Sequence, residues 1–125
     1  MAYEALDFYD IDSLLTDEER MVRDMVRDWV DEKILPNIEK ACHDGVFPDE
    51  WRVDLGEMGI LGAPLEGYGC PGLSYIAYGL ICQELERGDS GVRSFASVQG
   101  SLAMYPIWDF GSEEQKNHYL PKMTT

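Results

Sequence analysis

Two carboxylates of one predicted helix have different surroundings. On a helical wheel at about 100° per residue, the apolar side chains of residues 74–87 fill one half. Glu84 falls inside this apolar half, and Glu86 lies opposite. A carboxylate on a core-facing stripe must be ion-paired, hydrogen-bonded or protonated. Glu84 is therefore either satisfied by a neighbouring helix or part of a pocket wall, and the sequence leaves both interpretations open.

A lone arginine follows this helix. Arg93 is the only Lys or Arg in residues 88–115, and an uncharged run begins directly after it at Ser94. A guanidinium is a planar fork that can bind a carboxylate through two parallel hydrogen bonds, and a serine hydroxyl can add another. Arg93 and Ser94 are thus candidates for binding a ligand carboxylate. The alternative is an internal salt bridge to Asp89 or Glu86, and the residues alone favour neither.

Other reactive side chains indicate no site. The cysteines Cys42, Cys70 and Cys82 form no Cys-x-x-Cys pair, and the histidines His43 and His118 lie far apart. We therefore expect free thiols, with no disulfide framework, zinc site or other metal.

A glycine-rich segment, residues 67–72, could be mistaken for a phosphate-binding loop. It lacks the lysine of such a loop and follows no predicted strand, so we interpret it as a connection between helices.

Local signals predict the helices that must position these residues. Thr16 and Ser112 each begin a capping-box pattern, and Pro36 should end the first helix near Leu35. Ser74 can cap the helix that runs to about Arg87.

A short helix is expected over residues 49–58, closed by Gly59 in a left-handed conformation. No segment alternates convincingly between apolar and polar residues, so we expect no strand. The sequence predicts an all-α fold, an orthogonal or up-down bundle of four to six helices, in one domain over residues 1–125.

The charge is strongly acidic and unevenly distributed. Residues 1–60 hold 17 of the 24 acidic residues, whereas residues 61–125 hold 7, and the net charge is −14. Such a surface repels phosphate backbones, so we expect no nucleic-acid partner.

Residues 1–7 contain neither a basic region nor an apolar run, so we expect no secretory signal and a cytoplasmic location. The uncharged runs 67–83 and 94–108 are interrupted by Gly and Pro and fall short of roughly 18 consecutive apolar residues, so no membrane span is predicted.

Several runs together resemble the acyl-CoA dehydrogenase family, and most closely its glutaryl-CoA dehydrogenases. They are Gly67–Gly72, Ala77–Leu80, Glu84–Arg87, Asp89–Gly91, Arg93–Ser94, Ser97–Gln99, Pro106–Ile107, Gly111–Gln115 and Tyr119–Pro121. The last runs are common to many members, whereas Arg93–Ser94 indicates the glutaryl type. The resemblance spans nearly the whole chain and is weakest before Thr16.

The resemblance implies that this chain is an N-terminal helical domain. In the family, a β-rich middle domain and a C-terminal helical domain follow it, and the enzymes are usually homotetramers. FAD sits mainly between those two domains. A carboxylate base of the C-terminal domain removes the α-proton of the thioester while the flavin takes a β-hydride. We therefore expect no catalytic residue and no FAD on this chain. The parent enzyme would use FAD, an acyl-CoA substrate and an electron acceptor of unspecified identity.

By the same resemblance, Arg93 and Ser94 would hold the distal carboxylate of a glutaryl-type substrate, and Glu86 would join their network. Glu84 is similar to a glutamate common in the family near the pocket floor. Because the chain is so acidic, the other domains would have to bind the phosphates of CoA.

Two alternatives stay open. One is a monocarboxylic acyl-CoA enzyme in which Arg93 is internally paired, and the other is a free-standing helical protein-interaction module without catalysis. An exposed apolar patch is expected in either a separated domain or an interaction module, so we expect the isolated chain to self-associate or to be marginally stable.

Overall fold

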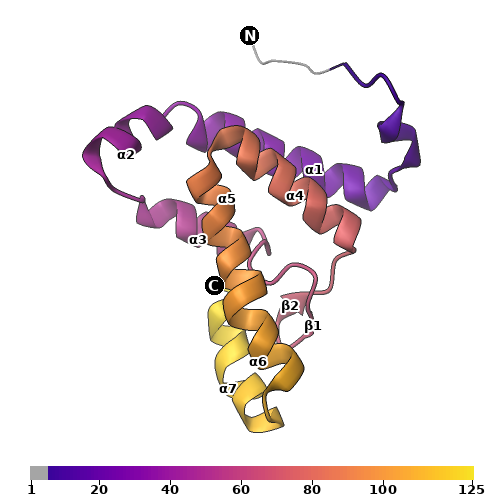
Figure 1. Ribbon diagram of the computed structural model, residues 1–125, viewed down its shortest axis with the longest axis vertical. Coiled ribbons are helices and arrows are strands. Elements are labelled where there is room, and N and C mark those ends of the chain that lie inside the picture. The colour runs from indigo at the N-terminus through magenta and orange to yellow at the C-terminus, as the bar shows by residue number, and fades with distance from the viewer. Residues whose placement is uncertain (1–5) are drawn as a thin grey trace.

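The computed structural model describes residues 6–125 as a set of helices with one small hairpin (Figure 1). The expectation about a secretory signal in residues 1–7 lies mostly outside this described part. In chain order the elements are η1 (Ile11–Leu14), α1 (Asp17–Trp29), η2 (Val30–Ile34), α2 (Ile38–Asp44), α3 (Asp49–Glu57), β1 (Glu66–Gly67), β2 (Cys70–Pro71), α4 (Tyr75–Gly88), α5 (Ser90–Ser97), η3 (Val98–Met104), α6 (Tyr105–Phe110) and α7 (Glu113–Met123).

The predicted all-α bundle is confirmed. η1 is a 3-10 turn, whereas η2 and η3 are π-helical. Because α1 continues into η2, and α5 continues through η3 into α6, the described residues form six helical rods: α1–η2, α2, α3, α4, α5–η3–α6 and α7. This number lies within the expected four to six.

The helices begin where the capping residues predict. The Thr16 hydroxyl accepts from the Glu19 amide while the Glu19 carboxylate accepts from the Thr16 amide, and Ser112 and Gln115 repeat the arrangement. The Ser74 hydroxyl caps α4 by accepting from an amide of its first turn. These caps satisfy amides that have no partner inside a helix.

The helix ends also follow the predictions. η2 ends at Ile34, two residues before Pro36, and α3 is followed by Gly59 in the left-handed region at φ 71°. Proline stops a helix because it has no amide hydrogen, and glycine adopts positive φ without strain.

The expectation of no strand is wrong at one place. β1 and β2 pair antiparallel, with Gly67 opposite Cys70, around Tyr68 and Gly69. Both turn residues have positive φ, 54° and 86°, as in a type I′ turn, whose twist suits a tight hairpin. The segment still connects α3 to α4, as predicted, and Trp108 Nε1 anchors it by donating to the Glu66 carbonyl at 2.8 Å.

α1 and α4 lie side by side and run in the same direction (Figure 1). Near the start of both, Ser74 Oγ donates to Glu19 Oε1 at 2.8 Å. Further along both, Arg27 Nη2 donates to Glu84 Oε1 at 2.7 Å. Residue numbers therefore increase in the same direction along both helices, so the helices are parallel.

The apolar core forms two clusters. The larger one lies among α1, η2, α3, α4 and α5, and its buried members are Val26, Trp29, Val30, Ile34, Trp51, Leu55, Ile60, Leu61, Ala63, Ile81, Leu85, Val92 and Ala96. The smaller one joins the hairpin region to η3 and α7 through Leu65, Met104 and Leu120. The larger cluster packs α4 and α5 against α1, η2 and α3.

The close approach of α4 to η2 gives a testable prediction about two glycines. A Cβ at Gly88 would lie 2.8 Å from Val30 Cγ1 and 3.2 Å from Ile34 Cγ2, so Gly88→Ala should lower the free energy of unfolding by about 1–3 kcal/mol. Gly79→Ala is the matched control, because a Cβ there meets nothing within 4 Å, and it should stabilise α4 by roughly 0.5–1 kcal/mol. Urea denaturation measures both, and a stabilised Gly88→Ala variant would contradict the packing.

Candidate functional site

Glu86 and Arg93 meet at the corner between α4 and α5, and Ser94 follows Arg93 on α5. Asp89 forms this corner with an extended backbone, and its carboxylate accepts two hydrogen bonds, 2.7 and 3.0 Å long, from amides of the first turn of α5. Asp89 is thus the cap of α5. The internal salt bridge of Arg93 is made with Glu86 instead.

Arg93 uses only part of its hydrogen-bonding capacity. Its Nε donates to Glu86 Oε2 at 2.6 Å, and its Nη1 donates to Ser97 Oγ at 3.3 Å. Within residues 6–125, Nη2 has no hydrogen-bond partner, and about a third of the side chain (35%) is exposed. The ion pair is therefore present, and donors remain for a ligand. Binding of a ligand carboxylate stays a prediction.

Glu86 is held from two sides. Besides Arg93, the Ser90 hydroxyl donates to its Oε1 at 2.5 Å. The hydrogen bonds from Arg93 and then Ser90 hold the pKa of Glu86 below its ordinary value, and Glu86 in turn raises the pKa of Arg93. Both side chains therefore remain charged at neutral pH.

Ser94 follows Arg93 and is half-buried. Its carbonyl accepts from Ser97 Oγ at 3.2 Å, while its hydroxyl has no partner within the described chain.

The sequence-based reasoning missed Ser90 and Ser97. Each lies four residues after a charged member of the group, which is the spacing at which side chains of one helix meet, and this spacing could have identified Ser97.

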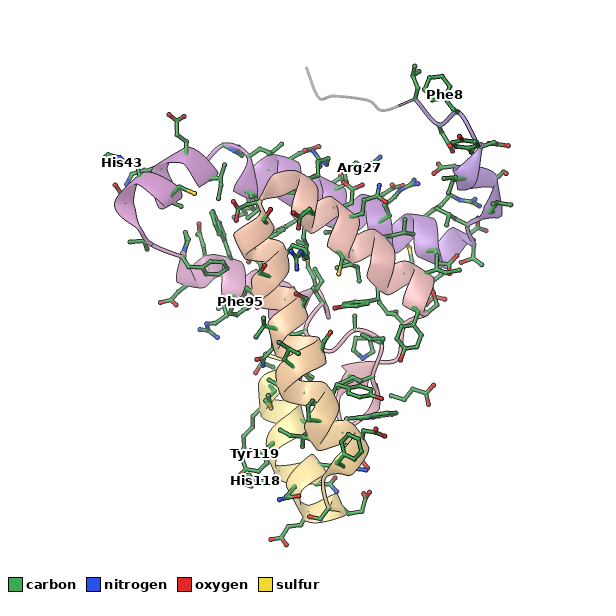
Figure 2. All side chains as sticks on the ribbon, viewed as in Figure 1. Phe8, Arg27, His43, Phe95, His118 and Tyr119 are labelled. Carbon is green, nitrogen blue, oxygen red and sulfur yellow. The ribbon has the colours of Figure 1, made fainter. Side chains whose placement is uncertain are left out.

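Glu84 is not brought together with the Arg93 group. Its side chain is 1% exposed and lies between α1 and α4, where Arg27 reaches it at 2.7 Å and Arg87 at 2.9 Å. Arg87 also pairs with Asp31 at 2.8 Å, and Figure 2 shows Arg27 on α1. These contacts favour the interpretation of Glu84 as a carboxylate satisfied by a neighbouring helix. Its role at a pocket stays a prediction.

The two arginines decide the charge state of Glu84. Burial raises the pKa of this carboxyl, but the hydrogen bonds and charges of Arg27 and Arg87 outweigh burial, so the pKa lies below its ordinary value. Glu84 is therefore ionised inside the protein at neutral pH.

The seam between α4 and α5–η3 continues beyond the ion pair. The Tyr78 and Ser101 hydroxyls lie 3.2 Å apart, and Cys82 lies one turn from Tyr78 on α4. Burial raises the pKa of both Tyr78 and Cys82, so neither is a ready base or nucleophile at neutral pH. We therefore assign Tyr78 and Cys82 a role in packing α4 against α5–η3 and no role in catalysis.

An apolar strip begins beside Ser94. Val98, Leu102 and Tyr105 follow it at helical spacing along η3 and α6, and they are 50%, 70% and 39% exposed. Together with Arg93 and Ser94, this exposed strip forms a surface that is polar at one end and apolar along its length.

A separate apolar groove of about 320 Å³ lies between α6 and α7, lined by Pro106, Ile107, Phe110, Gly111, Gln115 and Tyr119. None of the predicted site residues lines this groove.

No metal cluster of three or more His, Cys, Asp or Glu occurs among residues 6–125. Figure 2 shows His43 on α2 and His118 on α7 at opposite ends of the molecule. In the part of the chain that the structure describes, no helix is both long and apolar enough to cross a membrane.

Known proteins are similar to this chain in sequence and in fold. The family model of the acyl-CoA dehydrogenase N-terminal domain matches residues 16–125. A crystal structure of glutaryl-CoA dehydrogenase from Mycobacterium smegmatis with FADH2 is 47% identical, with a TM-score of 0.92 over 98% of this chain and 32% of that one. Another glutaryl-CoA dehydrogenase structure from Mycobacterium smegmatis is 56% identical, with a TM-score of 0.86 over 91% of this chain and 30% of that one.

Among curated proteins, the probable acyl-CoA dehydrogenase YngJ of Bacillus subtilis is 37% identical over 114 residues, which are 89% of this chain and 30% of that protein. The chain thus spans about a third of the length of the relatives it matches.

The ionised, buried state of Glu84 predicts a pH-dependent stability. Glu84→Gln removes the charge that Arg27 and Arg87 neutralise, so it should lower the free energy of unfolding by about 1–3 kcal/mol at neutral pH. Because the folded-state pKa is depressed, this contribution is complete above the pKa of the unfolded chain and is lost as pH falls through the folded pKa. The difference from wild type should therefore shrink on acidification.

Urea denaturation at several pH values tests this prediction. Glu39→Gln, at an exposed acid of α2, is the control and should change stability little at any pH. A Glu84→Gln variant as stable as wild type at neutral pH would contradict the role of the ion pair.

The three cysteines should differ in reactivity. Cys42 is exposed, whereas Cys70 and Cys82 are half-buried, and burial raises the pKa of both. Because the thiolate is the reactive form, iodoacetamide at neutral pH should modify Cys42 well before the other two. Mass spectrometry of timed digests measures this order, with the urea-unfolded chain as control, in which all three should react. Equal rates for Cys42 and Cys82 in the folded chain would count against the described burial.

Proposed function

Because the chain belongs to the acyl-CoA dehydrogenase family as its N-terminal domain, we propose that it forms one wall of an acyl-CoA pocket. The whole enzyme would be longer, would use FAD, and would oxidise glutaryl-CoA or a similar dicarboxylic acyl-CoA. The two structures that bear the name glutaryl-CoA dehydrogenase, at 47% and 56% identity, support this substrate class.

The observation that carries the proposal is the incomplete pairing of Arg93. Glu86 and Ser97 occupy its Nε and Nη1, and within the described chain nothing binds Nη2. Hydrogen bonds between a guanidinium and a carboxylate are short and charge-assisted, and a partly desolvated site strengthens them. The unused donors of Arg93 fit the distal carboxylate of a dicarboxylic substrate, and so does the hydroxyl of Ser94, which has no partner among residues 6–125.

The exposed strip supports the same orientation. From Ser94 to Leu102 the helix advances on the order of 10 Å, with Val98 between them. A glutaryl group whose carboxylate binds at Arg93 could lay its methylene groups along Val98, which is 50% exposed, and the CoA arm beyond the thioester could pass Leu102, which is 70% exposed. Burial of these apolar surfaces would favour binding.

This domain alone does not fit FAD. The pyrophosphate of FAD is anionic, whereas the chain has a net charge of −14. The glycine-rich segment 67–72 contains no Lys or Arg and folds as the β1–β2 hairpin, so it does not present a helix N-terminus to a phosphate. On our proposal the flavin, the CoA phosphates and the catalytic base all bind or lie in the other domains.

One observation favours a second candidate within the family. The 2.6 Å ion pair with Glu86 already neutralises Arg93, as a monocarboxylic acyl-CoA dehydrogenase would require. In that case Arg93 would be structural. Membership of the family favours either enzyme over the free-standing interaction module.

We extend the proposal to the assembly. The whole enzyme would be a cytoplasmic homotetramer that passes electrons to a separate acceptor, and other domains or subunits would cover the apolar surface that the bound substrate leaves exposed. Exposed contiguous apolar side chains support such covering surfaces.

Replacing Arg93 in the full-length, FAD-loaded enzyme tests the proposal. Arg93→Gln removes a charge-assisted contact, so kcat/KM for glutaryl-CoA should fall about ten- to a hundredfold, while butyryl-CoA, which has no distal carboxylate, should lose much less. Arg93→Lys should recover part of the activity, because an ammonium keeps the charge and lacks the planar fork.

Arg87→Gln is the matched control, since Arg87 pairs with the buried Glu84 and should affect both substrates alike while lowering the melting temperature. If Arg93→Gln behaves in the same way as Arg87→Gln, the monocarboxylic alternative replaces our proposal.

A further inference from the structure

Arg93 belongs to a chain of side-chain hydrogen bonds that starts at Ser90. Ser90 Oγ donates to Glu86 Oε1 at 2.5 Å, and Glu86 Oε2 accepts from Arg93 Nε at 2.6 Å. Each oxygen of Glu86 thus has a different partner. Arg93 meets this carboxylate through one of its nitrogens only.

A carboxylate without such a second partner would pair differently. Arginine and a carboxylate commonly bind through two parallel hydrogen bonds, one to each oxygen. If Glu86 turned both oxygens to Arg93, it would occupy a second guanidinium nitrogen, and fewer donors would remain for a ligand. The hydroxyl of Ser90 opposes this turn because it holds Oε1 away from Arg93.

We propose that Ser90 is a positioning residue for Arg93. By holding one oxygen of Glu86, it limits the Glu86–Arg93 contact to a single hydrogen bond and leaves Nη2 of the guanidinium for the distal carboxylate of the substrate. The inference rests on the proposed function, because it concerns the same carboxylate site.

Among residues 6–125, the Ser90 hydroxyl makes no hydrogen bond other than the one to Glu86. Asp89 caps α5, since its carboxylate accepts from the amides of Gly91 and Val92. Ser90 is the first residue of α5 and is exposed, and its side chain makes its hydrogen bond to Glu86. Removal of the hydroxyl should therefore leave the corner between α4 and α5 folded.

The experiment compares Ser90→Ala and Ser90→Thr in the full-length, FAD-loaded enzyme, with kcat and KM measured for glutaryl-CoA and butyryl-CoA. Loss of one neutral-to-charged hydrogen bond should raise KM for glutaryl-CoA roughly two- to tenfold in Ser90→Ala and leave butyryl-CoA unchanged. Ser90→Thr keeps a hydroxyl and should restore the wild-type KM. Ser101→Ala is the control, because Ser101 contacts Tyr78 and neither Glu86 nor Arg93, and it should behave as wild type on both substrates.

An unchanged ratio of the KM values for the two substrates in Ser90→Ala would overturn the inference. Equal losses of kcat/KM for both substrates, together with a lower melting temperature, would also overturn it. If Ser90→Ala does not fold, the isosteric pair Ser90→Thr and Ser90→Val carries the same comparison. The proposed function fails in a different way, since the wild-type enzyme would then show no preference for glutaryl-CoA.

Discussion

The buried carboxylate of Glu84 fixes how α4 is rotated against α1. Glu84 is 1% exposed and ionised, so it needs cations, and Arg27 of α1 and Arg87 of its own helix supply them. An uncompensated buried charge would cost several kcal/mol, so α4 cannot rotate against α1 without a large loss of stability. With Glu84 turned to α1, Glu86 faces α5 and meets Arg93. The ion pairs of Glu84 thus fix the face of α4 on which Glu86 lies.

Most of the helices could be predicted because their signals are local. Thr16, Ser74 and Ser112 satisfy amides within three residues of themselves, and Pro36 acts through its own missing amide hydrogen. Arg93 could also be identified as a candidate, since a lone cation before an uncharged run is visible in the chain, whereas the residues left its partner open between Asp89 and Glu86. Family resemblance supplied the role of Arg93, which residue types alone left open.

What could not be predicted depends on tertiary contacts. Of the two partners of Glu84, Arg27 lies 57 residues away in sequence, so no local pattern links them. The π-helical turn η3 includes Gly100, at which a Cβ would lie 3.4 Å from the amide nitrogen of Gly62, and such a close approach is a property of packing. The hairpin was missed because its turn uses Tyr68, a residue that rarely adopts positive φ.

The parallel pairing of α1 and α4 also has a consequence for the order of folding. Glu19 and Ser74 lie 55 residues apart, and Arg27 and Glu84 lie 57 apart, so the chain between them must close a long loop before either contact forms. For a loop of this length the length-dependent entropy of closure is about 3–4 kcal/mol. The α5–η3–α6 rod and α7 are joined by a short turn and meet through contacts of low sequence separation. We therefore expect the C-terminal helical hairpin to form early and the α1–α4 pair to be the late, rate-limiting closure.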